Sequence, residues 1–434
     1  MMNRISTKTN LDVRAPAQEN NKMKIMHALL LSAAMSGSVA AQTVTLEVAS
    51  FPDLDRGVKA AIPLFQEAHP DVEIKLVSLA FGDHHSAMTT SLATGSNLPD
   101  VMAVEVGFIG KFAASGGIED LSKPPYNAMQ YQDQFAKFTL PQATGGGGNL
   151  AAIPVDIGPG ALFYRQDLLQ KAEVDESAFS KNWEAFIDAG KKVKEKTGAY
   201  MVAHAGDLKD IIIRSDLEDG EGVFFDKDNH SLVTSPRFEK AFKVAKAARD
   251  AGIDAKVKAW TSEWTEGLRR GRIATQMMGS WVAGHLANWI APESAGLWRS
   301  KQLPDNVYAS WGGSFYAIPA KAQHKEEAWE FIRFLALNKS MQLEAFHKLD
   351  AFPALVTAQN DQFLQQPIEF LGGQKARVQW KEAADRIPAI TVNKYDTIAD
   401  EIVNAELDKV LLHDKDIKEA LADAHKLIKR RVRY

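Results

Sequence analysis

Residues 43–50 read TVTLEVAS, and apolar side chains alternate along this stretch with polar ones. A period of two is the pattern of a β-strand with one buried face. A segment with apolar residues at helical spacing follows, and it ends near Pro70. The alternation returns at residues 72–76, VEIKL, which predicts a second strand. This part of the chain therefore predicts an α/β fold.

The succession of strands and helices continues beyond this stretch. We expect a helix over about 84–95, a strand over 101–104 and another helix over about 108–114. Strands that alternate with helices are typical of a parallel sheet whose two faces are covered. Apolar spacing and helix start and stop residues predict further helices over about 166–172, 183–197, 235–251, 325–338 and 416–429.

A glycine-rich segment, PQATGGGGNL at residues 141–150, interrupts this pattern. Its composition favours a mobile surface loop. Residues 151–156 after it are predicted to form a strand. We therefore expect a boundary between two lobes near this segment.

The composition limits the classes of partner. The chain has 434 residues, of which 45% are hydrophobic and 24% charged, and its formal net charge is −4. That length is enough for two domains with cores of their own. Nothing in the charge indicates a nucleic-acid or anionic-membrane partner. The basic residues at 429–434 are interpreted as the solvated end of a helix, where cations suit the helix dipole.

The segment at residues 22–41 predicts export. Lys22 and Lys24 precede an apolar run, and small residues follow at 38–41, as in a cleaved secretory signal with Met23 as the true start. The run is shorter than the roughly 20 residues that span a bilayer. The chain has no cysteine, so we expect neither a lipid anchor nor disulfides, and a large compact fold stabilised by its core.

No motif indicates catalysis or a bound metal ion. Gly145–Gly148 lacks the Gly-Lys-Ser/Thr group that grips phosphates. His84 and His85 are adjacent, and neighbouring residues on a helix do not face each other. There is no Gly-x-Ser-x-Gly elbow, and no cysteine nucleophile is possible. A glycosidase pair stays open, because the sequence gives no distance between carboxylates. We expect a protein that is not an enzyme and that needs no cofactor or metal.

Six blocks, in this order along the chain, resemble the motifs of one family. They are LPDV at 98–101 with FAASGGIEDL at 112–121, IPVD at 153–156 with LFYRQDL at 162–168, WEAF at 183–186, the segment 267–274 with MMGSW at 277–281, GGSFYAI at 312–318 with KEEAWEF at 325–331, and IKEAL at 417–421. Together they span nearly the whole mature chain. The chain thereby resembles the bacterial extracellular solute-binding proteins, in their maltose-binding-like, sugar-binding branch.

The resemblance implies the fold and the function. The fold is a two-lobed α/β architecture of the periplasmic-binding-protein type (type II-like), with the ligand in a cleft between lobes whose hinge the chain crosses several times. The implied function is a periplasmic protein that carries a mono- or oligosaccharide to a membrane ABC transporter permease, as a monomer without a nucleic-acid partner. Binding of a polyamine or glycerol phosphate, and a secreted glycan hydrolase, remain as alternatives. The implied parts are residues 1–41 as extension and signal, 42–152 with about 311–358 as lobe 1, and 153–310 with about 359–434 as lobe 2.

A sugar has an apolar face and a rim of hydroxyls, so its site needs an aromatic plate and polar acceptors. Trp281, in QMMGSWVAGHL at 276–286, is the first candidate plate, because its small neighbours leave the ring face open and the resemblance implies stacking on the sugar. The simpler alternatives are a tryptophan wedged between helix and sheet, and carboxylates that only cap helices. Trp260 and Trp264 could line the cleft rim or anchor a helix, and neither is included. The predicted site residues are Trp281, Trp311, Gly312, Gly313, Asp53, Asp83, Glu105, Asp156 and Tyr395.

Overall fold

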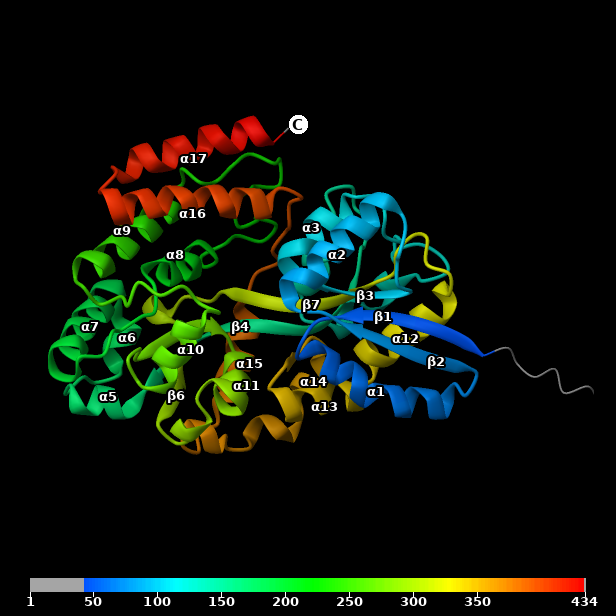
Figure 1. The fold of residues 1–434 in the computed structure, drawn as a ribbon, viewed down its shortest axis with the longest axis horizontal. Coiled ribbons are helices and arrows are strands. Elements are labelled where there is room, and N and C mark those ends of the chain that lie inside the picture. Colours follow the sequence, from blue (N-terminus) through cyan, green and yellow to red (C-terminus); the bar gives the residue numbers. More distant parts are fainter. Residues whose placement is uncertain (1–42, 433–434) are drawn as a thin grey trace, which may run out of the picture. The chain divides into compact units, whose positions relative to one another are not determined.

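Eight strands form one sheet in the computed structural model, which describes residues 43–432 (Figure 1). The hydrogen-bonded order is β2-β1-β3-β7-β4-β5, and β6 and β8 also pair with β4. The strands are β1 Val44–Ser50, β2 Val72–Ser78, β3 Val101–Glu105, β4 Ile153–Arg165, β5 Thr275–Gly279, β6 Trp298–Lys301, β7 Ser310–Ala317 and β8 Phe352–Pro353. The predicted signal at 22–41 lies outside the described residues.

The sheet is mixed rather than parallel. β1 pairs in parallel with β2 and β3, as the alternation of strands and helices predicts. β7 lies antiparallel between β3 and β4, and β4 is also antiparallel to β5, β6 and β8. The prediction of a parallel sheet is therefore correct for the first three strands and wrong for the others. Local alternation reports that a segment is a strand, but the direction of its partner depends on where the chain returns.

The helices confirm the predicted positions to within a few residues. The α-helices are α1 Leu54–Ala68, α2 Phe81–Thr94, α3 Val106–Ala113, α4 Thr139–Gln142, α5 Gln166–Lys171, α6 Ser177–Lys181, α7 Trp183–Thr197, α8 Ala205–Ile213, α9 Pro236–Asp250, α10 Ser262–Arg269, α11 Val282–His285, α12 Lys325–Leu337, α13 Lys339–Leu349, α14 Val356–Gln359, α15 Ala376–Arg386, α16 Asp396–His413 and α17 Ile417–Arg431. Shorter turns are η1 Ala128–Gln134, η2 Leu286–Ile290, η3 Pro292–Ser294, η4 Pro304–Asn306, η5 Gln362–Gln365 and η6 Glu369–Leu371. None of the helices within 43–432 combines the length and the apolar character that a bilayer crossing requires.

Local caps explain why several helix ends are predictable. Asn182 precedes α7, and its side-chain oxygen accepts a hydrogen bond from the N–H of Ala185 at 2.8 Å. Gly198 ends the same helix in the left-handed conformation, with φ 77°. Pro236 is the first residue of α9, where its missing N–H costs nothing. These signals lie within a few residues of the ends that they set.

Helices cover both faces of the first three strands, with α2 and α3 on one face and α1 and α12 on the other (Figure 1). Two hydrophobic clusters result. One contains the apolar side chains of β1, β3 and β7, and the other contains those of α7, α8, α9, α16 and α17. β4 joins them, since Phe163 belongs to the first cluster and its neighbours Leu162 and Tyr164 to the second.

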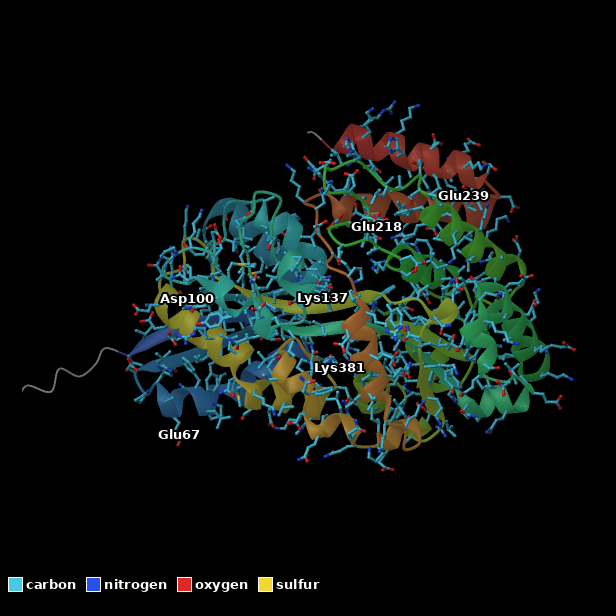
Figure 2. The ribbon with its side chains drawn as sticks, turned by 180° about the vertical axis from the view of Figure 1, so that it is seen from behind. Glu67, Asp100, Lys137, Glu218, Glu239 and Lys381 are labelled. Carbon is cyan, nitrogen blue, oxygen red and sulfur yellow. The ribbon has the colours of Figure 1, made fainter. Side chains whose placement is uncertain are left out.

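A buried carboxylate ties together β1, the start of β3 and the turn before α12. Oδ2 of Asp100, labelled in Figure 2, accepts a hydrogen bond from the N–H of Glu47 in β1 at 3.0 Å. Its Oδ1 accepts from the N–H groups of Gln323 and His324, both at 3.0 Å. Three donors satisfy this carboxylate, which is 6% exposed. It fixes the start of β3, whose other end carries a predicted site residue.

Candidate ligand-binding site

Three carboxylates lie at positions set by the ends of regular elements and by the β4–β7 pairing. Glu105 ends β3, and its Oε2 accepts a hydrogen bond at 2.8 Å from the backbone N–H two residues later, at the start of α3. Asp156 lies in β4, and its Oδ1 accepts from the N–H of Ser314 in β7 at 2.8 Å. Asp396 begins α16, and its Oδ2 accepts from the N–H of Asn393 at 2.7 Å. Backbone donors therefore hold all three carboxylates in place.

These carboxylates bind protons more tightly than carboxylates in water do. Burial raises the pKa of Glu105 to about 7; Asp156 adds to this rise, while a backbone hydrogen bond and Arg214 oppose it. Burial raises the pKa of Asp156 to about 6, against its hydrogen bonds with Ser314. Burial also raises the pKa of Asp396 to about 7, again with Arg214 opposing the rise. Arg214 thus acts electrostatically on Glu105 and Asp396, and Asp156 acts on Glu105, as neighbouring charges do.

Arg214, directly after α8, is the cation of this site. Its Nη1 donates to the backbone oxygen of Asp210 at 3.0 Å and to that residue's Oδ1 at 3.3 Å. The guanidinium carbon lies 4.7 Å from the ring centre of Trp311, which is a cation–π distance. One guanidinium thus faces an indole from β7 and influences the carboxylates of Glu105 and Asp396.

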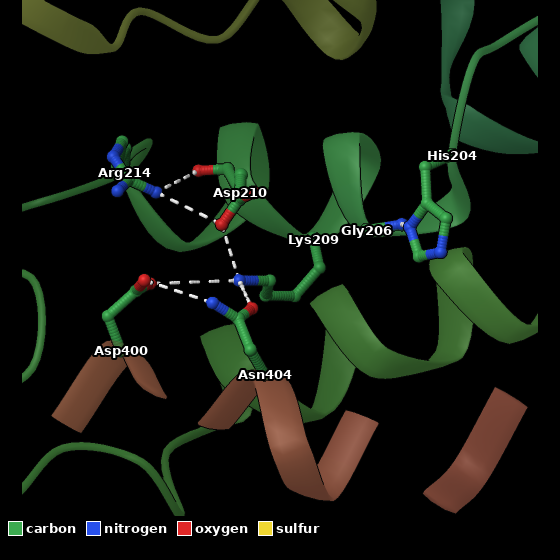
Figure 3. Close-up of polar contacts among 7 residues, drawn as sticks. All are labelled: His204, Gly206, Lys209, Asp210, Arg214, Asp400 and Asn404. Atoms are coloured by element: carbon green, nitrogen blue, oxygen red, sulfur yellow. Dashed lines mark hydrogen bonds and ion pairs between the residues drawn. The ribbon is translucent and has the colours of Figure 1, made fainter. Parts of the chain in front are cut away.

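A buried network beneath Arg214 connects α8 to α16 (Figure 3). Lys209 is fully buried, and its Nζ donates to Oδ1 of Asn404 at 2.6 Å, pairs with the carboxylate of Asp210 and lies 3.9 Å from Oδ1 of Asp400. Nδ2 of Asn404 donates in turn to Oδ2 of Asp400 at 2.9 Å. Although burial opposes the effect, the two cations hold the pKa of Asp210 below its usual range. Because a buried ammonium requires paired partners, this network fixes Asp210 and through it Arg214.

Trp281 follows β5, and part of its half-buried indole packs on protein. Its Nε1 donates to the backbone oxygen of Trp311 at 3.0 Å. Its ring stacks on that of Trp260, with 5.8 Å between centroids and 21° between planes. A Cβ atom at Gly279 would collide with this indole and with the Trp311 oxygen. The small neighbours of Trp281 therefore make room for the indole itself, and Trp260 lies against part of the ring that the sequence predicts to be open.

Trp311, Gly312 and Gly313 lie together in β7, where its pairing with β4 shifts register. Gly312 has φ 82° and Gly313 has φ 134°, values that residues with a side chain rarely adopt. A Cβ atom on Gly312 would lie 3.1 Å from Nε1 of Trp281. Gly312 therefore lets β7 pass close to Trp281, Gly313 lets it approach Asp156 of β4, and the predicted plates Trp281 and Trp311 are neighbours.

Asp53 follows β1 and lies beside His285, which in turn contacts the ring of Trp281. Its Oδ2 lies 3.5 Å from Nε2 of His285, whose ring centre is 5.2 Å from that of Trp281. Burial lowers the pKa of His285; the carboxylate of Asp53 opposes this effect, and Arg56 adds to it. Asp53 therefore joins the site beside Trp281.

A comparison with protein families identifies the chain. The profile of the family described as bacterial extracellular solute-binding protein matches residues 49–342, more than half of the chain. The chain is a bacterial extracellular solute-binding protein. Its predicted family is confirmed.

Relatives and solved structures of similar fold agree with this assignment. The lactose-binding protein of Rhizobium radiobacter is 28% identical to this solute-binding protein over 374 residues, 80% of this chain and 83% of the relative. The arabinooligosaccharide-binding protein of Bacillus subtilis (strain 168) is 25% identical over 283 residues, 62% of this chain and 64% of the relative. A solved extracellular solute-binding protein of family 1 has a TM-score of 0.77 at 22% identity, and covers 89% of this chain and 99% of its own. The maltose-bound MalE3 protein of T. maritima has a TM-score of 0.73 at 18% identity, and covers 90% of this chain and 100% of its own. The predicted two-lobed α/β fold is confirmed.

Two predicted residues of this solute-binding protein lie outside the contacts described above. Asp83 is exposed in the first turn of α2, and among the described residues no hydrogen bond or ion pair joins it to another predicted residue. Tyr395 directly precedes Asp396, and its backbone N–H donates to Oδ1 of Asn393 at 3.0 Å. Lys394 Nζ lies 4.9 Å from the Tyr395 ring centre.

The sequence does not predict Arg214, Asp396 or His285 as site residues. Arg214 lies four residues after Asp210, a spacing that indicates a contact on one helix but not which strands the guanidinium faces. His285 likewise lies four residues after Trp281. No local signal marks either one as part of a binding site.

The two tryptophans of WTSEW contact each other, with 5.1 Å between ring centroids, but differ in burial. Trp264 is fully buried, and its Nε1 donates to Oε1 of Gln276 at 2.8 Å, so it anchors α10. Trp260 is 54% exposed and stacks on Trp281. Trp260, which is not among the predicted site residues, therefore belongs beside the predicted site.

The adjacent histidines hold the backbone of β3 near its end. Nε2 of His85 accepts from the N–H of Glu105 at 3.2 Å, while its Nδ1 donates to the oxygen of Phe81 at 2.8 Å. Nε2 of His84 donates to the oxygen of Ala103 at 2.8 Å. Burial lowers the pKa of His85 to about 4, which keeps the ring neutral as these bonds require. The pair therefore positions the end of β3.

One set of side chains within residues 43–432 could hold a metal ion. Ligand atoms of Asp226, Asp228 and His230 lie within 4.8 Å of one another. Oδ1 of Asp226 already accepts from the N–H groups of Asp228 and His230, at 2.9 and 2.8 Å. These bonds are those of a polar turn, and they account for the cluster without an ion.

A cavity of about 800 Å³ borders the site at Asn393, whose backbone N–H donates to Asp396, but none of the predicted site residues lines it. Its walls come from residues 129–146, 222–229 and 391–393, and include Lys137, which Figure 2 labels. The volume suits a small ligand. The lining lacks the indole–guanidinium pair and the carboxylates around it, so we place the site by its chemistry rather than by volume.

Proposed function

We propose that this solute-binding protein binds a neutral mono- or oligosaccharide and delivers it to a membrane ABC transporter permease. The observation that carries the proposal is the position of Arg214, which faces the Trp311 ring and acts on both Glu105 and Asp396. Such a group offers donors and acceptors for sugar hydroxyls. Covering one apolar sugar face with an indole contributes roughly 1–2 kcal/mol. Relatives named for lactose and for arabinooligosaccharides support this ligand class.

The site draws on both lobes of the proposed arrangement. We assign to lobe 1 residues 42–152 with about 311–358, and to lobe 2 residues 153–310 with about 359–434. Glu105 then belongs to lobe 1 and Arg214 to lobe 2. A ligand that contacts both lobes favours the closed form, because only a difference in affinity shifts that equilibrium. The closed form is the one presented to the permease.

The proposal includes the setting in which the protein works. A signal at residues 22–41 directs it to the periplasm and is removed, and no lipid anchor is attached. The mature protein acts as a monomer without catalysis, cofactor or nucleic acid. Its ligand leaves unchanged when the permease accepts it.

One observation favours a second candidate ligand. Glu105, Asp156 and Asp396 outnumber the single guanidinium of Arg214, and an excess of carboxylates suits a cation such as a polyamine. A phosphate ester fits less well, because Arg214 already bonds Asp210 and faces two further carboxylates.

Calorimetric titration and thermal unfolding of residues 42–434 with galactose, lactose, maltotriose, putrescine and glycerol 3-phosphate test the proposal. We expect a saccharide to bind and to raise the melting temperature, because it binds only the native state. Arg214→Ala should abolish this shift. Arg237→Ala is the matched control, since Arg237 pairs with Glu221 at 3.0 Å. Binding of putrescine alone, or release of reducing sugar from the oligosaccharides, would contradict the proposal.

A further inference from the structure

Four aromatic rings form a continuous row from Trp260 to Trp289. Trp260, Trp281 and His285 are mutual neighbours, with centroid separations of 5.8 Å for Trp260–Trp281, 5.2 Å for Trp281–His285 and 5.9 Å for Trp260–His285, and Trp289 follows His285 at 5.7 Å. The last three are four residues apart, so one side of α11 and η2 carries them. Trp260 comes from the loop before α10, and α10 itself contacts η2. We call these four residues the aromatic row.

The two ends of the row are open to solvent. Trp260 is 54% exposed and Trp289 is 41% exposed, and among the described residues they are the only tryptophans that count as exposed. Exposed indoles grouped on one surface are typical of a binding site, because they leave apolar area in water. The row therefore offers ring surface that the protein does not cover.

Trp260 is also held in an unfavourable backbone conformation. Its φ is 69°, in the left-handed region where a bulky side chain is an outlier. The cap of α10 follows directly, with Oγ1 of Thr261 accepting from the N–H of Trp264 at 3.2 Å and donating to the oxygen of Lys258 at 2.9 Å. Such strain persists where the surroundings enforce it, and it concentrates at functional sites. The conformation keeps the exposed indole against Trp281.

Polar side chains from the loop and helix after β1 line the same row. Oδ2 of Asp53 lies 3.5 Å from Nε2 of His285, and Oδ1 of Asp53 lies 3.7 Å from Nε of Arg56. Arg56 is more than half exposed. Ring faces beside a carboxylate, a guanidinium and an imidazole match the two surfaces of a saccharide, its apolar face and its hydroxyl rim. An acyl chain would offer these polar groups no hydrogen-bond partner.

We infer that the aromatic row is an extended subsite, which makes the preferred ligand an oligosaccharide rather than a monosaccharide. The inner unit lies at Trp281 and Trp311, and later units lie along Trp260 toward Trp289. Asp53 and His285 bond the hydroxyls of these later units. This inference rests on the proposed function. It adds the length of the ligand and the residues that recognise its later units.

Calorimetric titration of the mature chain with a monosaccharide and with the trisaccharide of the same sugar tests the inference. We expect the wild type to bind the trisaccharide at least tenfold more tightly. Trp260→Ala should lower the ratio of the two affinities about tenfold, and Trp260→Phe should restore most of it, because a ring remains. Leu412→Ala, which truncates another exposed apolar side chain, is the control and should leave the ratio unchanged.

The outcomes separate this inference from the function on which it rests. Equal affinities of the wild type for the two ligands would overturn the extended subsite and leave saccharide binding standing. An equal loss for both ligands in Trp260→Ala would also overturn it, because Trp260 would then only support Trp281. Absence of any saccharide binding by the wild type would overturn both.

Discussion

Replacement of Glu105 by glutamine should make the ligand-free protein more stable at alkaline pH and leave its stability at acid pH nearly unchanged. Burial raises the pKa of Glu105 to about 7 from its ordinary value of 4.5. In that range the native state holds a proton that the unfolded state releases. The stability that this proton supplies is full below about pH 4.5 and is lost as the pH rises through 7. Glutamine does not ionise, so the variant keeps this stability at alkaline pH.

The magnitude follows from the size of the pKa change. One pKa unit corresponds to about 1.4 kcal/mol, so a rise from 4.5 to about 7 corresponds to roughly 3 kcal/mol at most. Glu105 keeps some contact with solvent, which reduces the expected gain to about 1–3 kcal/mol at pH 8. The amide oxygen of glutamine can still accept the backbone hydrogen bond at the start of α3. At pH 5 we therefore expect a difference near zero.

Urea unfolding followed by circular dichroism at pH 5, 6, 7 and 8 measures this difference. Glu67→Gln is the control, because Glu67 is an exposed residue of α1, and this change should have little effect at any pH (Figure 2). A Glu105→Gln difference that is the same at pH 5 and pH 8 would refute the argument. A variant less stable than the wild type at pH 8 would refute it as well.

Three further substitutions test other parts of the site. Trp281→Ala should keep the fold and weaken saccharide binding at least tenfold, or about 1.4 kcal/mol; unchanged affinity by calorimetry would exclude stacking. Lys209→Met should destabilise the protein by about 3–5 kcal/mol, because Asp210 and Asp400 lose their buried cation; urea unfolding measures this, and a loss under about 1 kcal/mol would contradict the network. Arg214→Lys should weaken saccharide binding at least tenfold, because an ammonium cannot replace the planar fork; an equal loss in Arg237→Lys would show a general effect of losing a guanidinium.

The local elements of this protein follow from its sequence because their signals lie within a few residues of one another. The side chain of Asn182 caps α7 and Gly198 ends it, so both ends of that helix are readable. Asp416 accepts from the N–H of Glu419 in the same way at the start of α17. The ordered family blocks also predicted the two-lobed fold, because their spacing along the chain is itself sequence information.

Only the tertiary structure decided which side chains meet. β7 enters the sheet antiparallel between β3 and β4, and this places Trp311 beside Trp281. Arg214 ends a helix without any local mark of function, and its partners come from β3, β7 and α16. Packing between segments far apart in sequence sets these contacts, and no pattern within one segment records them. The sequence by itself thus determined the elements and the family and predicted candidate site residues, whereas the charge arrangement around Arg214 and the aromatic row depend on how the chain folds back on itself.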